Sequence, residues 1–108
     1  MNVNMPSALA TYFAAEDMAD TDVLERCFAP DAVVHDEGHV MQGLDAIKAW
    51  KLAARAKYQY HVTPKRASTA GATTTVLAQV TGSFAGSPVD LTYIFGLANE
   101  KIASLEIH

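Results

Sequence analysis

The chain has 108 residues, of which 50% are hydrophobic and 19% charged, and its formal net charge at pH 7 is −4. This length suits a single domain spanning residues 1–108, and the composition is that of a globular protein rather than a disordered one. The negative charge argues against nucleic acid or an anionic membrane as a partner, because both require a basic face.

The cellular environment is indicated by the cysteine count and by the absence of targeting signals. A single cysteine, Cys27, excludes an intrachain disulfide and fits a reducing compartment. The first six residues lack the basic and apolar regions of a signal peptide. No apolar run approaches the ~20 residues that a membrane span needs. We therefore expect a cytoplasmic protein.

Two helices are predicted at the start of the chain. Pro6 and Ser7 are typical of the first turn and the cap of a helix. Residues 20–22 then cap a short second helix, which residues 30–31 (Pro-Asp) end. In the first helix, spacings of three and four residues place four side chains on one face: Leu9, Tyr12, Phe13 and Glu16.

A hairpin and a third helix follow. Residues 32–36 form a short β-branched run before Gly38, so they are predicted as a strand with residues 39–42 as its hairpin partner. Residues 43–45 open the third helix. Its apolar side carries three residues, Ile47, Trp50 and Ala54. Its other side carries three cations, Lys48, Lys51 and Arg55. We interpret these cations as a solvated face rather than a binding patch.

From residue 58 onward the hydrophobic period changes from 3.6 to 2. Tyr58, Tyr60 and Val62 alternate with polar neighbours, and further strands are predicted at residues 73–81, 89–95 and 101–107. Connections this short pair sequential strands antiparallel. Helices first and strands afterwards indicate an α+β fold, in which three helices pack on a strongly curved mixed or antiparallel sheet. Such a sheet forms a cone-shaped half-barrel with an internal pocket.

Five segments along the chain occur in a characteristic order. They are residues 12–16 (YFAAE), 20–24 (DTDVL), 28–36 (FAPDAVVHD), 43–50 (GLDAIKAW) and 101–105 (KIASL). This order resembles the nuclear transport factor 2-like superfamily, specifically its SnoaL-like and ketosteroid isomerase-like members. The resemblance implies a cystatin-like cone. It does not imply one reaction, because the superfamily hosts isomerases, cyclases, dehydratases, epoxide hydrolases and non-catalytic binding domains on one scaffold.

The resemblance also implies three catalytic positions. Aligned without gaps, Tyr12 falls where the ketosteroid isomerases keep their oxyanion-stabilising tyrosine. Asp36 falls where they keep the carboxylate that moves the proton. Thr92 occupies the position of their protonated aspartate, and the nearest carboxylate is Asp90. The sequence departs from the isomerases there, because a threonine hydroxyl donates a hydrogen bond more weakly than a carboxylic acid.

The residues themselves support a site at Asp36. If Ala32 and Val34 face inward, the two-residue period points Asp36 inward with them, where apolar walls raise its pKa toward that of a useful general base. The alternative is that the strand ends at His35 and Asp36 merely opens a turn. Tyr12 lies on the apolar face of its helix, where its hydroxyl either meets a ligand or bonds to the backbone.

Aromatic and apolar side chains supply the expected wall of the pocket. They are Phe13, Phe28, Val34, Trp50, Tyr58, Tyr60, Tyr93 and Phe95. In a hollow cone the core and the pocket wall are formed by the same residues. The cluster of His35, Asp36, Glu37 and His39 lacks the spacing of a metal site, so we expect neither a metal nor a cofactor.

Two functions remain open at this point. One is a cofactor-free isomerase, cyclase or dehydratase that binds an apolar cyclic or carbonyl compound. In it Asp36 is the general base, and Tyr12 and Thr92 stabilise the developing oxyanion. The other is a non-catalytic ligand-binding or dimerisation module of the same fold. In both cases we expect a homodimer through the convex face of the sheet, because residues 73–81 give that face few charges.

Overall fold

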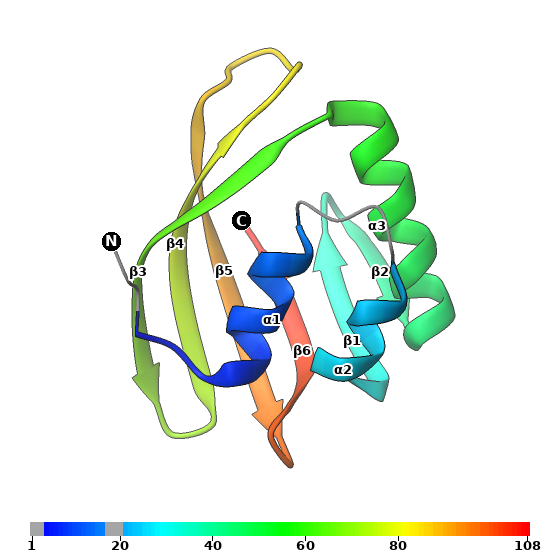
Figure 1. The fold of residues 1–108 in the computed structure, drawn as a ribbon, viewed down its shortest axis with the longest axis vertical. Coiled ribbons are helices and arrows are strands. Elements are labelled where there is room, and N and C mark those ends of the chain that lie inside the picture. The colour runs from blue at the N-terminus through cyan, green and yellow to red at the C-terminus, as the bar shows by residue number, and fades with distance from the viewer. Residues whose placement is uncertain (1–3, 17–20) are drawn as a thin grey trace.

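The computed structural model describes residues 4–16 and 21–108, except for the side chain of Tyr58. The chain begins with α1 (Ser7–Ala15), a 3₁₀ turn η1 (Thr21–Val23) and α2 (Leu24–Cys27). The hairpin of β1 (Phe28–Asp36) and β2 (His39–Gln42) leads into the long helix α3 (Leu44–Tyr58). Four strands complete the fold (Figure 1): β3 (His61–Ala70), β4 (Thr73–Thr81), β5 (Val89–Ala98) and β6 (Lys101–Ile107).

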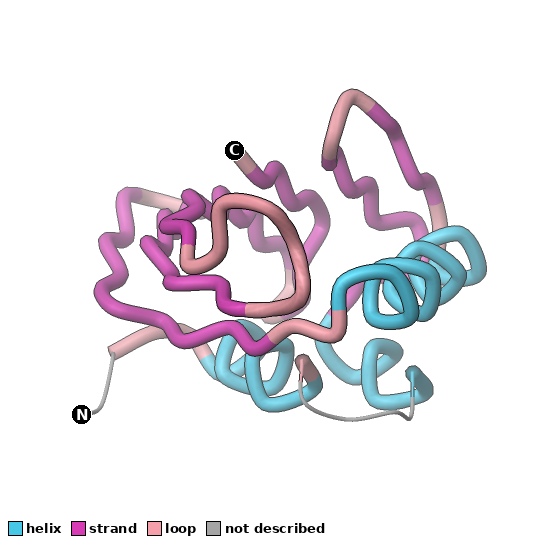
Figure 2. Tube along the Cα trace, turned by 90° about the horizontal axis from the view of Figure 1, so that it is seen from above, coloured by secondary structure: helices cyan, strands magenta, loops and turns pink. Residues whose placement is uncertain are grey.

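The six strands form one mixed sheet in the order β2-β1-β6-β5-β4-β3. Strands β1 and β6 pair parallel, and every other neighbouring pair is antiparallel. The strands curl into an open arc, with the helices on one side of it (Figure 2). The sheet does not close, because β2 and β3 are both edge strands. This is the predicted α+β cone, and the four predicted antiparallel strands of the second half are confirmed.

A two-residue turn places the end of β1. Glu37 and Gly38 both have positive φ, 52° and 78°, which is the conformation that twists a tight hairpin correctly. Asp36 pairs with His39 directly across this turn. Asp36 is therefore the last residue of its strand, so the alternative in which the strand ends at His35 is wrong, although Asp36 does adjoin the turn.

The first half of the chain differs from the prediction at the boundary between α2 and β1. The helix ends at Cys27, and the strand already begins at Phe28. Pro30 and Asp31 lie inside β1 and do not end a helix. They fit there because the pairing of β1 with β6 is interrupted between Phe28 and Val33, so the missing N–H of proline disrupts no regular ladder.

Helix α3 is longer than expected and ends at Tyr58, so the prediction that Tyr58 belongs to a strand is wrong. Asp45 lies in its first turn, and Arg55 and Lys57 lie in its last, which complements the helix dipole. Gln59 then adopts the left-handed conformation (φ 43°), and its N–H bonds to the Arg55 carbonyl. This C-terminal turn sends the chain back so that Tyr60 lies beside the helix it follows.

The core lies between the helices and the concave face of the sheet. Tyr12 on α1 is fully buried and makes edge-on contacts with Phe28 and Phe95, their ring centroids lying 5.7 and 5.5 Å away. Phe13 contacts Tyr93 in the same way, at 5.5 Å. Edge-to-face packing of this kind is favourable beyond the area it buries. The aromatic cluster therefore fixes α1 against the sheet and fills the end of the cone beneath it.

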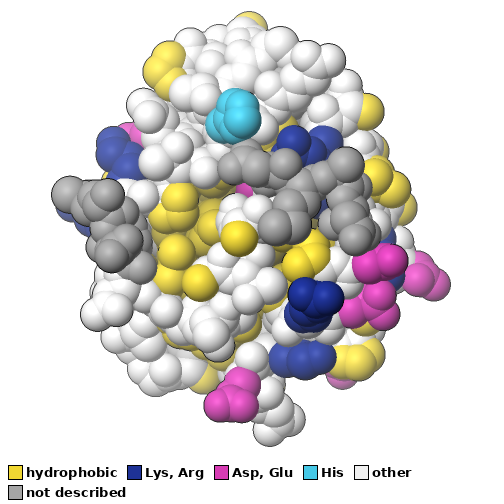
Figure 3. Space-filling view, viewed as in Figure 1, with side chains coloured by type: hydrophobic (Ala, Val, Ile, Leu, Met, Phe, Trp, Pro, Cys, Tyr) yellow, Lys and Arg dark blue, Asp and Glu magenta, His cyan; other side chains and the backbone are white. Residues whose placement is uncertain are grey.

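Charged side chains remain mostly on the outside of the helical layer, where acidic and basic groups lie next to one another around α2 (Figure 3). Lys48 bonds to Asp22 at 3.3 Å and to Glu25 at 3.0 Å. No helix in residues 4–16 or 21–108 has both the length and the apolar character needed to cross a membrane.

Candidate functional site

A cavity of about 440 Å³ opens between α3, the β1–β2 hairpin and the strands β4–β6. Most of its wall is apolar, and its polar groups come from Asp36, Glu37, Trp50, Lys51 and the hydroxyls of Tyr60 and Tyr93. The apolar wall consists of Ala54, Val80, Phe84, Ala85, Val89, Leu91 and Ile107. A concave, largely apolar site with a few convergent polar groups is the usual form of a small-molecule pocket.

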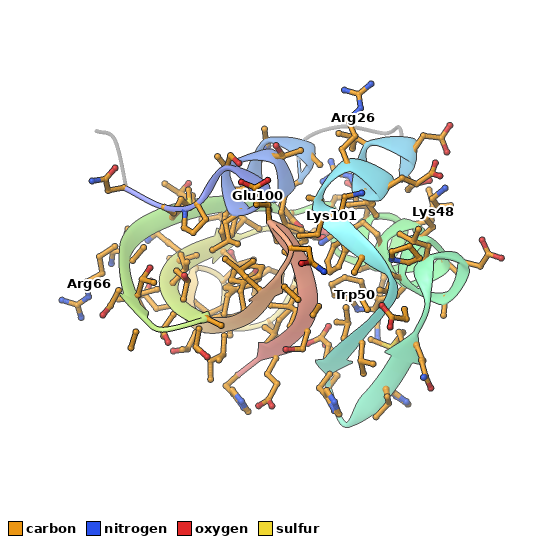
Figure 4. The ribbon with its side chains drawn as sticks, turned by 90° about the horizontal axis from the view of Figure 1, so that it is seen from below. Arg26, Lys48, Trp50, Arg66, Glu100 and Lys101 are labelled. Atoms are coloured by element: carbon orange, nitrogen blue, oxygen red, sulfur yellow. The ribbon has the colours of Figure 1, made fainter. Side chains whose placement is uncertain are left out.

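Asp36 lies on this cavity, as its position on the strand predicted. Ala32 and Val34 of β1 are fully buried, and Asp36 is half-buried two residues further along the same face. Its Oδ2 accepts a hydrogen bond from the Trp50 indole Nε1 at 3.0 Å. Trp50 extends from α3 toward β1 (Figure 4). Burial raises the pKa of the Asp36 carboxyl above its ordinary value, while the Trp50 hydrogen bond opposes the shift.

Lys51, one residue beyond Trp50, holds a buried polar cluster at the inner end of the cavity. Its side chain is 5% exposed, and that of Glu16, its ion-pair partner, is 1% exposed. The ammonium also donates to the hydroxyls of Tyr12 and Tyr60, each at 3.1 Å. These three acceptors match its three N–H groups. The cluster thus joins α1, α3 and the residue before β3.

Aromatic rings surround the same ammonium. The Lys51 Nζ lies 4.5 Å from the centroid of the Trp50 ring, 4.9 Å from that of Tyr12 and 5.6 Å from that of Tyr60. Such contacts favour a cation that has left water. Burial nevertheless lowers the pKa of Lys51, and the negative charge of Glu16 limits that shift.

The Tyr60 hydroxyl is the neutral donor that the cluster presents to the cavity. Its oxygen accepts the Lys51 hydrogen bond, and its own proton can be donated either to Glu16 or to a bound ligand. Burial, followed by the charge of Glu16, raises the pKa of Tyr60 well above its ordinary value. The hydroxyl therefore stays protonated at neutral pH. A protonated hydroxyl beside an ammonium can stabilise negative charge that develops on a bound oxygen.

The other predicted catalytic residues do not reach the cavity. Tyr12 lies behind Lys51 and is fully enclosed, so its hydroxyl serves the buried cluster rather than a ligand. Thr92 lies between Leu91 and Tyr93, which both line the cavity, so the alternation along β5 points it to the opposite, convex face. The structure thus separates Tyr12 and Thr92 from Asp36 and provides Tyr60 near the position where an oxyanion donor was expected.

The predicted pocket wall divides into two groups. Trp50, Tyr60 and Tyr93 line the cavity. The other members, Phe13, Phe28, Val34 and Phe95, are buried in the core beneath it and do not line it. Tyr58 ends α3, and its side chain lies outside the described part of the structure. Core and pocket wall therefore overlap only in part: Tyr60, Val80 and Tyr93 belong to both, while the rest of the aromatic cluster fills one end of the cone.

The prediction that Lys51 belongs to a solvated face is wrong. Lys48, one turn earlier on α3, does lie outside, with its ammonium on Asp22 and Glu25. Lys51 follows Ile47 by four residues, the spacing that places both on the buried face. Glu16 falls on the buried face of α1 in the same way. The presence of one charged residue on each apolar face was the signal that could have identified the pair.

Cys27 and two histidines are further residues whose side-chain chemistry could suggest a functional site. Cys27 is buried, and burial raises its pKa to about 11, so it is not a nucleophile at neutral pH. His35 and His61, which alternate to the opposite face from their apolar neighbours, are both exposed. Within the residues that the structure describes, no three His, Cys, Asp or Glu side chains form a group that could hold a metal ion.

The chain matches the model of one protein family over most of its length. The SnoaL-like domain family matches residues 9–105 of the chain. The chain belongs to the SnoaL-like domain family. No curated protein matches it.

Solved structures resemble this SnoaL-like domain over nearly its whole length. A protein from Sinorhizobium meliloti described as a proposed polyketide cyclase is 44% identical, with a TM-score of 0.93, over 96% of this chain and 95% of that one. A protein of ketosteroid isomerase-like fold from Catenulispora acidiphila, in complex with trimethylamine, is 26% identical, with a TM-score of 0.85, over 97% and 86% of the two chains. A cystatin-fold protein from Novosphingobium aromaticivorans shares the fold at 21% identity, with a TM-score of 0.77, over 97% and 99%.

Proposed function

We propose that this SnoaL-like domain is a cofactor-free isomerase or cyclase that removes a proton from a carbon next to a carbonyl group. The observation that carries the proposal is that the Asp36 carboxylate and the Tyr60 hydroxyl line one largely apolar cavity. A base and a hydrogen-bond donor on the same cavity are the two groups that enolisation requires. The substrate class we propose is an apolar cyclic ketone or related carbonyl compound.

In the proposed reaction Asp36 takes the α-proton and Tyr60 donates to the carbonyl oxygen as negative charge develops on it. The Lys51 ammonium behind Tyr60 adds a favourable field, because it donates to the oxygen of the same hydroxyl. The raised pKa of Asp36 makes it a stronger base than an exposed aspartate. An isomerase returns the proton to another carbon, and a cyclase uses the enolate carbon to form a ring bond.

Two comparisons support this proposal without assigning a substrate. The Sinorhizobium meliloti protein, which shares 44% of the sequence, is described as a proposed polyketide cyclase, and polyketides carry the acidic α-protons that such a site would remove. The Catenulispora acidiphila protein was obtained with a small organic molecule bound. We propose that the ligand of this chain is similarly small and that its apolar part lies against Val80, Val89 and Leu91.

The test is the exchange of α-protons in deuterated water, because it needs no knowledge of the natural substrate. A suitable probe is 2-tetralone, an apolar bicyclic ketone. We expect the native protein to accelerate the incorporation of deuterium observed by NMR. The Asp36→Asn variant should lose most of the acceleration, since a general base typically contributes about 10²–10⁴-fold in rate. A matched control is Asp90→Asn, a carboxylate that bonds to Lys65 on the exposed surface.

A different result would favour the alternative, a non-catalytic ligand-binding or dimerisation module. If 2-tetralone binds to the native protein but its α-protons exchange no faster than with the Asp36→Asn variant, Asp36 is not a base and the cavity only binds the ligand.

In either function we also propose a cytoplasmic homodimer formed through the convex face of the sheet, where the partly exposed side chains Leu77, Thr92 and Ile94 gather on β4 and β5. Light scattering that shows only an 11.6 kDa species would contradict the dimer.

A further inference from the structure

A second reactive group faces the cavity besides Asp36. Lys51 lines the cavity but is almost completely shielded from bulk water, and it is the only lysine on that wall among the described residues. An amine in such a place can attack a carbonyl group once it has lost a proton, because neutral amine and not ammonium is the nucleophile. The question is whether the surroundings can remove that proton and accept the product.

The neighbouring carboxylate is built to take the proton. The Lys51 ammonium donates directly to Glu16 Oε1. The second oxygen of the same group, Oε2, is buried and has no hydrogen-bond partner among the described residues. The lone pairs of this unpaired oxygen are therefore free to accept a proton from the amine. Burial also lowers the pKa of Lys51, which favours the same transfer.

The surroundings also suit the product, which would be a positively charged iminium group on the same nitrogen. The rings of Trp50, Tyr12 and Tyr60 already surround a cation at this point, with centroids 4.5, 4.9 and 5.6 Å from Nζ. These contacts and the charge of Glu16 do not depend on whether the nitrogen carries three hydrogens or a carbon double bond. The Tyr60 hydroxyl lies beside the nitrogen, where it can donate to the oxygen of an incoming carbonyl.

We infer that Lys51 is a covalent capture site for small apolar aldehydes and ketones, which it binds as a protonated imine inside the cavity. This activity goes beyond the proposed enolisation and does not require Asp36.

The step balances within the groups described. Glu16 takes one proton from the Lys51 ammonium, and rotation about the Cε–Nζ bond turns the lone pair toward the cavity. The nitrogen forms a bond to the carbonyl carbon as the carbon–oxygen π bond breaks, and a proton moves from nitrogen to oxygen to give a carbinolamine. Glu16 then returns its proton to the hydroxyl group, which leaves as water. The nitrogen keeps one hydrogen and the positive charge, so an ammonium and a carbonyl compound become an iminium and water.

The experiment traps the imine on the native protein. Benzaldehyde is the probe, because it is apolar, small enough for the cavity and without α-protons that Asp36 could remove. Sodium cyanoborohydride supplies the hydride that reduces an iminium to a stable secondary amine. Peptide mapping by mass spectrometry then gives the labelling rate at each of the five lysines and the amino terminus. Lys48 is the internal reference, since it lies one turn away on the outer side of the same helix.

We expect Lys51 to be labelled at neutral pH severalfold faster than Lys48, because a lowered pKa raises the free-amine fraction of Lys51, whereas two carboxylates hold the Lys48 ammonium. Labelling of Lys48 as fast as or faster than Lys51, or an unlabelled Lys51, would overturn the inference. The Asp36→Asn variant should retain the Lys51 label. Loss of α-proton exchange in that variant therefore tests the proposed function separately. The Lys51→Arg variant, which keeps a cation but forms no imine, should leave the other lysines labelled as before.

Discussion

The Lys51 ammonium and the Glu16 carboxylate meet in the interior of the protein, where both side chains are almost completely buried. Glu16 caps the C-terminal end of α1, a position at which the helix dipole disfavours negative charge. The lysine offsets this effect and supplies the donor that the carboxylate needs. Together with the hydrogen bond from Lys51 to the Tyr12 hydroxyl, the pair determines how α1 and α3 meet at the inner end of the cavity.

Removal of one partner of this pair should destabilise the protein strongly. In Glu16→Gln the Lys51 ammonium stays buried without its counter-charge, and such a loss typically costs about 3–5 kcal/mol of unfolding free energy. Urea unfolding followed by circular dichroism measures the change. Glu25→Gln, which removes a partner of the exposed Lys48, should change stability little. The double variant Glu16→Met, Lys51→Met should recover much of the loss, and a double variant as unstable as the single one would contradict this account.

Asp36 should make activity and stability respond to pH in opposite directions. Its folded pKa is raised, so its contribution to stability is complete below the unfolded value of about 3.9 and is lost as pH rises through the folded value. Asp36→Asn should therefore be more stable than the native protein at neutral pH, and the gain should vanish in acid. Exchange of 2-tetralone protons should instead rise with pH through the folded pKa, because only the carboxylate is a base.

Trp50 offers a check on that assignment. Its indole donates to the charged form of Asp36, so Trp50→Phe should move the acid limb of the pH–rate profile to higher pH. An unmoved limb would mean that the titrating group is not Asp36.

Tyr60 and Tyr12 should behave differently although both accept a hydrogen bond from Lys51. Tyr60→Phe removes the donor that faces the cavity, and loss of one such donor typically lowers the rate about 10²–10³-fold. Tyr12→Phe removes a hydroxyl that touches no ligand, so its main effect should be a loss of about 1–3 kcal/mol in unfolding free energy. Exchange kinetics and urea unfolding of both variants provide the comparison. A larger rate effect for Tyr12→Phe would return the oxyanion role to that residue.

Substitutions at Leu91 and Thr92 on β5 should have different effects, because Leu91 lines the cavity and Thr92 points to the opposite face of the sheet. Leu91→Phe adds volume to the cavity wall and should weaken the binding of 2-tetralone, with an overpacking cost of about 1–3 kcal/mol if the wall cannot move. Thr92→Val changes the next residue but should leave ligand binding and exchange unaltered. Titration by fluorescence of Trp50, the chain's one tryptophan, measures both affinities. Weakened binding in Thr92→Val would show that the Thr92 side chain does reach the site.

The fold could be predicted because local patterns and tertiary structure agree over most of the chain. The bounds predicted for β4 and β6 match the structure, and the period-2 pattern placed Tyr93 and Phe95 on one face of β5. Tyr58 was misplaced for a physical reason. Its alternation with Tyr60 continues the strand pattern backwards, but α3 extends until Gln59 adopts a left-handed conformation that no periodicity reveals.

The site could be predicted only in part, because its polar groups are defined by contacts between distant segments. Asp36 was predicted from the family resemblance together with the alternation along its strand. The Lys51 contacts to Glu16 and Tyr60 span 35 and 9 residues, and a lysine at the edge of an apolar stripe is most often solvated. Thr92 was assigned by alignment with the ketosteroid isomerases, but this chain does not carry their protonated aspartate at that position. The alternation along β5 would have placed it correctly.

The parallel pairing of β1 with β6 has a consequence for how the molecule is made. Strand β6 lies between β1 and β5, so it joins the first hairpin to the three strands of the second half. Until β6 has paired with both of its neighbours, these two parts share no backbone ladder, and the concave wall has a gap at its centre. Pairings between such distant segments are slow to form. We therefore expect the pocket to form late in folding, and a chain in which β6 is not yet paired exposes open sheet edges that favour aggregation.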